Sequence, residues 1–126
     1  MTPRWLSERA VLAMHAAQIV EHGGGEGVRD LGLLASALAR ALNLVAYGDP
    51  DLPALAAAYA FGIARNHPFV DGNKRTAFVV AATLLALNGM RLRASEKDVV
   101  ETILALAAGR LEELQLAEWF RHWSSY

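Results

Sequence analysis

The 126-residue sequence predicts an all-α protein, a compact bundle of about six helices. Two observations favour this class. Ala and Leu, both strong helix formers, fill 24 and 19 positions, whereas the β-branched residues Val, Ile and Thr together fill only 16. Apolar residues also recur at helical spacing between breaks rich in Gly, Pro and Asp, which places one helix between each pair of breaks.

The first two helices are delimited by their capping residues. Ser7 is a suitable N-cap for a helix that runs to about His22, where Gly23–Gly25 ends it. Asp30 caps a second helix that continues to the break at Gly48–Pro50. The apolar positions expected to face the core are Leu12, Ala16, Ile19 and Val20 in the first helix, and Leu34, Leu38, Leu42 and Val45 in the second.

The third and fourth helices flank a short loop with the sequence HPFVDG. Asp51, with a proline two residues later, starts the third helix, which ends before Pro68. The fourth helix runs from about Asn73 to Asn88. Apolar residues surround its axis so completely that we expect it to be the central, buried helix.

A short extended piece at residues 90–93 precedes the fifth helix. Ser95 with Asp98 resembles a variant capping box, which predicts a helix from there to Gly109. A last helix carries the apolar residues Leu114, Trp119, Phe120 and Trp123.

Composition and charge restrict the class of protein. Twelve basic and thirteen acidic residues give a net charge of −1, and there is no long basic run, which argues against direct binding of nucleic acid. The long apolar stretch Ala77–Leu87, which Thr83 interrupts, falls short of the roughly 20 residues that a membrane span needs. The absence of Cys removes disulfides and thiol chemistry. We expect one domain over residues 1–126, in the cytoplasm and without a membrane partner.

Residues 67–76 contain the densest group of side chains that can bind phosphate, metal or a proton. If the fourth helix begins near Asn73, the unpaired N–H groups of its first turn and its dipole form an anion site in the loop. Gly72 would let the backbone approach an anion closely, while Lys74 and Arg75 add positive charge beside it. The segment therefore indicates a phosphate or nucleotide site.

Two further residues of the segment suggest chemistry at that site. Asp71 offers oxygen ligands suited to Mg²⁺, and His67 could act as a general base. Plain structural interpretations also exist: His67 before Pro68 is a common helix stop, and residues 71–73 form a good turn with Asn73 as N-cap. Two cations in a first helical turn oppose the helix dipole, however, which favours an anion as their partner.

The run His67–Arg75 resembles the signature of the Fic/Doc superfamily, and specifically of its Doc (death-on-curing) branch, in which Lys stands where Fic adenylyltransferases have Gly. The similarity extends to the Gly-rich segment with Val28–Asp30, to the helix at residues 33–49 and to Asn88–Gly89. This resemblance implies the all-α Fic/Doc fold, with an active-site loop between the third and fourth helices.

The resemblance also implies a role for each residue of the run. His67 matches the base that deprotonates the target hydroxyl, Asp71 matches the Mg²⁺ ligand, and Phe69 matches a buried anchor of the loop. The residues that match the phosphate-binding positions around the helix N-terminus are Gly72, Asn73, Lys74 and Arg75. Arg65 is a candidate substrate contact, although a solvated arginine at a helix end explains it equally well. The histidines without a partner pattern, expected to be ordinary surface or half-buried residues, are His15, His22 and His122.

For function, the resemblance implies the toxin of a type II toxin–antitoxin system. Such a toxin uses ATP with Mg²⁺ and transfers the terminal phosphate to a Ser or Thr hydroxyl of a protein, with elongation factor Tu as the family's target and translation arrest as the outcome. Two alternatives remain open: a Fic-like adenylyltransferase that transfers AMP, and a catalytically silent nucleotide-binding module. Lys74, in the place of Gly, puts adenylyl transfer second.

Control of the activity is expected to come from a separate antitoxin protein. The chain contains no Ser/Thr-x-x-x-Glu-Gly/Asn inhibitory motif. Its apolar content of 54% is high for an isolated domain of this size. We therefore expect the antitoxin to lay a helix or an extended peptide into an apolar groove between the sixth and first helices.

Overall fold

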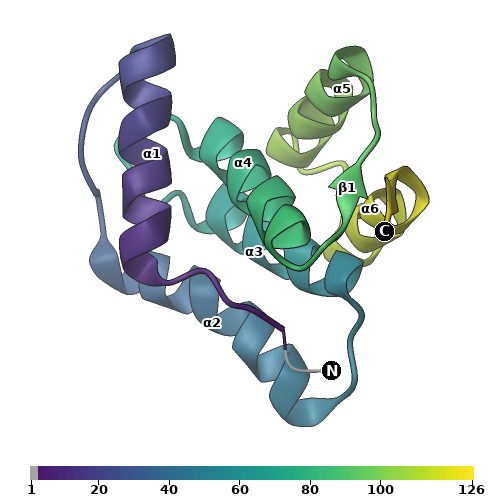
Figure 1. The fold of residues 1–126 in the computed structure, drawn as a ribbon. Coiled ribbons are helices and arrows are strands. Elements are labelled where there is room, and N and C mark those ends of the chain that lie inside the picture. Colours follow the sequence, from purple (N-terminus) through teal and green to yellow (C-terminus); the bar gives the residue numbers. More distant parts are fainter. Residues whose placement is uncertain (1–2) are drawn as a thin grey trace.

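The computed structural model describes residues 3–126, which form six α-helices and one small antiparallel sheet (Figure 1). The helices are α1 (Glu8–His22), α2 (Leu31–Tyr47), α3 (Leu52–Asn66), α4 (Asn73–Leu87), α5 (Glu96–Ala107) and α6 (Glu113–Trp123). The strands are β1 (Arg91–Leu92) and β2 (Ser124–Ser125). The predicted all-α class is confirmed. Within the described residues, no helix has both the length and the apolar character that crossing a membrane requires.

Short polar side chains start four of the helices, as the sequence predicted. In each case the side-chain oxygen accepts a hydrogen bond from the backbone N–H three residues later, which satisfies a donor that the helix leaves unpaired. These capping residues are Ser7, Asp30, Asp51 and Ser95. The predicted helix ends agree with the observed ends to within two residues.

The most buried helix is α3, and α4 lies beside it in the middle of the molecule, so the expectation that the fourth helix would be the central one is only partly right. Twelve of the fifteen residues of α3 are buried, against eight of fifteen in α4. The many alanines of α3 let α2, α4 and α6 pack closely on different sides of it. α4 is also largely apolar, but it begins with the exposed Lys74 and Arg75 at the loop and leaves Leu87 exposed at its other end.

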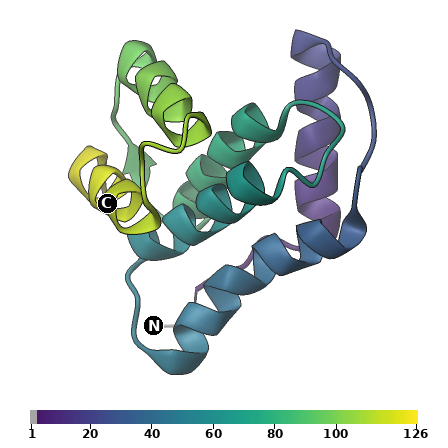
Figure 2. The same ribbon diagram turned by 180° about the vertical axis from the view of Figure 1, so that it is seen from behind.

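The helices are arranged around this centre in two groups. α3 and α4 run through the middle, with α1 and α2 on one side and α5 and α6 on the other, as both views show (Figures 1 and 2). Because α1 and α6 lie on opposite sides, the predicted groove between the sixth and first helices does not form.

The buried face of α1 differs from the predicted one. α1 buries Val11, His15 and Ile19, whereas Val20, which was predicted to face the core, is 85% exposed. The face was misread because one of its three buried positions is a histidine, which an apolar pattern does not count. Ala16 is exposed as well.

The buried face of α2 is built mainly from small residues. Leu34 is buried as predicted, but the other buried positions are Ala37 and Ala41, and Leu42 and Val45 are exposed. Alanines allow α2 to lie close against α3, and the larger side chains then remain on the outer face. Side-chain size, rather than apolar character alone, therefore decides which face is buried.

Residues near both ends of the described chain contact the link between α4 and α5. The Arg4 N–H donates to Asn88 Oδ1 at 2.7 Å, and Asn88 Nδ2 donates to the Arg4 carbonyl at 3.0 Å. At the other end, β2 pairs antiparallel with β1, so the extended piece predicted at residues 90–93 is partly a strand. The link between α4 and α5 is thus fixed by residues from both ends of the described chain.

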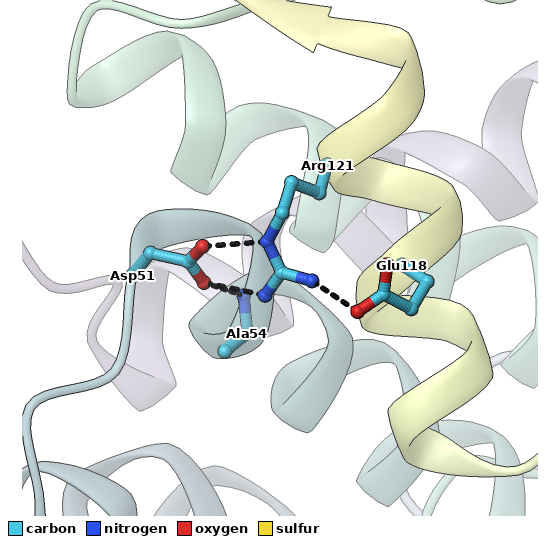
Figure 3. Close-up of polar contacts among 4 residues, drawn as sticks. All are labelled: Asp51, Ala54, Glu118 and Arg121. Atoms are coloured by element: carbon cyan, nitrogen blue, oxygen red, sulfur yellow. Dashed lines mark hydrogen bonds and ion pairs between the residues drawn. The ribbon is translucent and has the colours of Figure 1, made fainter.

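Arg121 of α6 forms a bidentate ion pair with Asp51 at the start of α3 (Figure 3). Arg121 Nε and Nη2 donate to Oδ2 and Oδ1 of Asp51 at 2.7 and 3.0 Å, and Arg121 Nη1 donates to Glu118 at 2.7 Å. Asp51 also caps α3 by accepting from the Ala54 N–H at 3.0 Å. These hydrogen bonds, with the one from Arg121 the largest contribution, hold the pKa of Asp51 below its usual value.

Candidate active site

The loop between α3 and α4 opens onto a cavity of about 520 Å³. One part of the lining comes from the loop and the first turn of α4, and the other comes from α5. The lining residues are His67, Val70, Asp71, Gly72, Asn73, Lys74 and Arg75 on the first side, and Val100, Ile103 and Leu104 on the second. The structure therefore gathers most of the predicted cluster around one cavity, with a polar and an apolar wall.

His67 follows the last turn of α3 and lies at the edge of the cavity. Its backbone adopts the left-handed conformation, with φ 49° and ψ 56°, and its N–H donates to the Ile63 carbonyl at 3.1 Å. The residue is exposed. An exposed imidazole at the mouth of a cavity is accessible to a hydroxyl group on a substrate as large as a protein.

Asp71 presents an ionised carboxylate to the cavity. Oδ1 accepts from the Gly72 N–H at 2.9 Å, and Oδ2 accepts from the Gly25 N–H at 3.2 Å. These two hydrogen bonds, the Gly72 bond first, lower the pKa of Asp71. Gly24 lies equally close: it has φ 122°, and a Cβ there would lie 2.7 Å from Asp71 Oδ2. The Gly-rich segment thus has a second role besides ending α1, because its Gly25 N–H donates to the Asp71 carboxylate.

The N-terminus of α4 has no side-chain cap. Its N-cap is Gly72, at φ 74°, and no side chain within residues 3–126 accepts a hydrogen bond from the first-turn N–H groups. Lys74 and Arg75 extend from this turn and are exposed at the cavity. An uncapped helix start with two adjacent cations suits a phosphate, which can accept from backbone N–H groups and side chains together.

Asn73 holds the loop from its inner side. Its side chain is buried, and its Oδ1 accepts from the Phe69 N–H at 2.9 Å while its Nδ2 donates to the Phe69 carbonyl at 3.0 Å. One interpretation of the sequence made Asn73 the N-cap of this helix, and the structure shows that it is not: the N-cap is Gly72. Because this side chain is buried against the Phe69 backbone, the backbone N–H of Asn73 is the group that it offers to a phosphate at the start of α4.

Phe69 and His15 pack together beneath the loop. Phe69 is 1% exposed, and its ring is stacked on the His15 imidazole with centroids 3.8 Å apart and planes inclined by 4°. His15 Nε2 lies 2.8 Å from the Asp71 carbonyl oxygen. His15 was predicted to be a surface or half-buried residue, but it is buried at 4% exposure and supports the loop.

The segment between α1 and α2 pairs with the loop along its backbone. The Val70 N–H donates to the Gly27 carbonyl at 3.1 Å, and the N–H groups of Arg29 and Asp30 donate to the Pro68 carbonyl at 2.7 and 3.1 Å. Only the similarity of residues 28–30 to the Fic/Doc pattern drew attention to this segment in the sequence. Nothing in its composition revealed that it contacts the loop.

One candidate substrate contact lies outside the cavity lining, and two residues that line the cavity have no signal in the sequence. The Arg65 guanidinium lies 5.3 Å from the centroid of the Phe61 ring, and Arg65 does not line the cavity. Conversely, the sequence gave no indication that Val100 and Leu104 of α5 line it. They are 49% and 56% exposed. The amphipathic pattern of α5 identifies a helix but not which loop lies opposite it.

Comparison with known proteins is consistent with this arrangement. The model of the family described as "Fic/DOC family" matches residues 5–85, which contain the whole loop. "Toxin Doc" of Mycolicibacterium smegmatis is 44% identical over 95 residues, 72% of each chain. "Protein kinase doc" of Escherichia phage P1 is 32% identical over 119 residues, 94% of each chain. By its sequence, its all-α fold and the residues around its cavity, the chain belongs to the Fic/Doc family.

Proposed function

We propose that the protein is the toxin of a type II toxin–antitoxin system and a protein kinase. In this proposal it transfers the terminal phosphate of ATP to a Ser or Thr hydroxyl, with elongation factor Tu as the first candidate target. The observation that carries the proposal is the grouping of His67, Asp71 and Lys74 around one cavity at the uncapped start of α4. The names of the relatives, "Toxin Doc" and "Protein kinase doc", support its two halves.

The phosphate groups would lie at the start of α4. Backbone N–H groups of the first turn donate to their oxygens, Lys74 adds a mobile point charge, and Arg75 can donate two parallel hydrogen bonds. Phosphoryl transfer depends mainly on positioning and on neutralising charge, so this donor set meets its main requirements.

The residues present also suit the Mg²⁺ that accompanies ATP. Asp71 is the one carboxylate in the cavity lining, its pKa is lowered, and each oxygen keeps a further lone pair beyond the N–H bond it accepts. Mg²⁺ at nucleotide sites takes one or two carboxylates, with phosphates and water as the other ligands. Residues 3–126 hold no group of three or more His, Cys, Asp or Glu side chains that could bind a cation by themselves, so the ion would arrive with the nucleotide. When bound, it would neutralise phosphate charge.

His67 would act as the general base. Its imidazole takes the proton of the target hydroxyl as the hydroxyl oxygen forms a bond to the γ-phosphorus. The bond between the γ-phosphorus and the oxygen that bridges to the β-phosphate breaks, and ADP leaves with that oxygen. The phosphate ends on the target as a Ser or Thr ester.

Lys74 would select the orientation of the nucleotide. A lysine side chain at this position fills space that glycine leaves open for a diphosphate in Fic enzymes, and it offers its ammonium group to the transferred terminal phosphate. Shape and charge then favour the same orientation. Adenylyl transfer, which needs the opposite one, is therefore the second candidate function.

The position of an isotope label in ATP distinguishes phosphate transfer, adenylyl transfer and nucleotide binding without transfer. The protein is incubated with elongation factor Tu, Mg²⁺ and ATP labelled at either the α or the γ phosphorus. We expect label on the target from the γ position only. Label from the α position only would establish adenylyl transfer. Nucleotide binding without label from either position would contradict elongation factor Tu as the target, and the same result with the proteins of a whole-cell lysate would establish a silent binding module.

Variants then test the residue roles. His67→Ala and Asp71→Ala should each abolish transfer and growth arrest with an unchanged circular dichroism spectrum. Lys74→Gly should lose γ-transfer even if nucleotide still binds. Lys97→Gly is the matched control, because Lys97 is the second residue of α5 as Lys74 is of α4. A folded His67→Ala variant that stays fully toxic, or unchanged γ-transfer by Lys74→Gly, would contradict the assigned roles.

The proposed partner is a cognate antitoxin, and α2 offers it an apolar surface. Leu31, Leu42 and Val45 lie on one face of α2 and are 59%, 52% and 39% exposed. Co-expression with the neighbouring reading frame should give one peak in size-exclusion chromatography, and Leu42→Glu should split it. Separate elution of the two wild-type proteins at micromolar concentration would count against the pair.

A further inference from the structure

His67 has a backbone conformation that its residue type rarely adopts. Among residues 3–126 it is the one non-glycine residue with positive φ, at φ 49° and ψ 56°. An L-residue other than glycine is destabilised in this region, so the surrounding structure has to hold it there. The direction in which the imidazole leaves the chain depends on this conformation.

Arg29 contacts the backbone on both sides of that residue. Its Nε donates to the His67 carbonyl at 2.8 Å, and its Nη2 donates to the Asn66 carbonyl at 3.0 Å. Its own backbone N–H donates to the Pro68 carbonyl at 2.7 Å. One residue thus satisfies three consecutive carbonyl groups, and it does so from a segment 38 positions earlier in the chain.

We propose that Arg29 is a positioning residue that fixes the His67 backbone and so aims the imidazole at the target hydroxyl. This inference rests on the proposed function. The guanidinium is suited to the task because its planar fork holds two carbonyl oxygens in a fixed relation, which the single ammonium of a lysine does not do. Arg29 itself is exposed, so its removal leaves no buried hole and the carbonyl groups can turn to water.

A purely structural role would have a different signature. An arginine at the C-terminal end of a helix stabilises it through the last carbonyl groups and the dipole, whatever that helix carries. Arg121 supplies the matched comparison, because it is also an exposed forked arginine and binds the opposite end of the same helix α3 through Asp51. If both arginines only stabilise α3, removing either should change stability and nothing else.

The test compares Arg29→Met, Arg29→Lys and Arg121→Met in the full chain. We expect Arg29→Met to lower kcat for phosphate transfer by about tenfold or more, with the Kd for ATP and Mg²⁺ within about twofold of wild type. Arg29→Lys, which keeps the charge but not the fork, should retain less than half of wild-type kcat. Arg121→Met should keep wild-type kcat even if it unfolds at lower urea concentration.

A backbone measurement separates this inference from the proposed function. The Cα and Cβ chemical shifts of His67, which report φ and ψ, should move in Arg29→Met and stay fixed in Arg121→Met. This readout needs no substrate, so it stands even if no phosphate transfer is found with wild type. Unchanged His67 shifts in Arg29→Met would overturn the proposal. Wild-type kcat in Arg29→Met would also overturn it, and so would a loss of kcat in Arg121→Met as large as that in Arg29→Met.

Discussion

At the scale of single residues, the loop is held mainly through its backbone. Side chains from three different elements bind its carbonyl groups: Arg29 at His67, Asn73 at Phe69, and His15 at Asp71. None of these bonds requires a particular loop side chain as partner. The loop side chains that line the cavity are therefore not needed to hold the loop backbone in place, and they can contact a ligand.

Asn73→Ala should destabilise the protein by about 1–3 kcal/mol, because the buried N–H and carbonyl of Phe69 lose their partners. Urea denaturation measures the loss. Asn43→Ala, an exposed position on α2, carries the same gain in helix propensity without lost bonds, so it should change stability by no more than about 0.5 kcal/mol. Equal stability of the two variants would show that the Asn73 bonds contribute nothing.

Gly24→Ala should weaken the binding of ATP with Mg²⁺, because its new Cβ would displace the Asp71 carboxylate. Gly27→Ala is the control: it also has positive φ, at 98°, but nothing lies within 4 Å of its added Cβ. Both variants should lose about 1–2 kcal/mol of stability from backbone strain. Calorimetry should show weaker nucleotide binding for Gly24→Ala alone, and equal affinities would separate Gly24 from the function proposed for Asp71.

The sequence predicted the polar side chains that line the cavity, but it missed His15 and Arg29, which hold the loop. His67 and Asp71 stand in a dense run of reactive types, so they are recognisable from local sequence. His15 and Arg29 act on backbone atoms, and a backbone carbonyl has no sequence signature. Their partners lie 56 and 38 positions away, and only the folded chain brings them together.

At the scale of elements, helix starts were predictable because a capping side chain and the backbone N–H that donates to it lie three residues apart. Which helix is the most buried was not predictable. Both α3 and α4 have long apolar runs, but α3 is the helix with alanines on several sides, and small residues let three neighbours approach. Which helix becomes central depends on the sizes of side chains on all its neighbours, and these are spread over the whole chain.

The ion pair between Asp51 and Arg121 predicts a change in stability at acid pH. Because the folded state lowers the pKa of Asp51, the pair contributes stability that is complete above pH 3.8 and is lost as pH falls through the lower folded value. Both side chains are exposed, so the contribution is at most about 1 kcal/mol. The difference in unfolding free energy between wild type and Arg121→Met should therefore shrink below pH 3.8.

Urea denaturation across a pH series gives this difference directly. Arg110→Met serves as control, because Arg110 is exposed and forms no ion pair within residues 3–126. Its difference from wild type should not vary with pH in this range. If the Arg121→Met difference were also independent of pH, the pair would contribute no measurable stability.

At the scale of the whole molecule, burial is unequal between the two walls of the cavity. α3, which ends at the loop, has twelve buried residues, whereas α5, which supplies the apolar wall, has two: Thr102 and Leu106. Local opening is easiest where few apolar contacts have to be broken. One wall is therefore anchored in the core, and the other is attached lightly.

Amide hydrogen exchange should show this difference. The amides of α5 should exchange through local opening at a lower free energy than those of α3, which should require global unfolding. Binding of ATP with Mg²⁺ in the cavity should slow exchange in α5 more than in α6. Equal protection of α3 and α5 without ligand would contradict the expected gradient.

The central position of α3 constrains how the protein is made. α1 and α2 leave the ribosome first, yet the surfaces on which they pack belong to α3 and α4, which end at residues 66 and 87. The nascent chain therefore carries unsatisfied apolar faces until α3 and α4 have emerged. The loop cannot be fixed before Asn73 follows it out, and the opposite wall of the cavity comes later still with α5. Because the two walls lie in successive parts of the chain, a chain that ends before α5 lacks the apolar wall of the cavity.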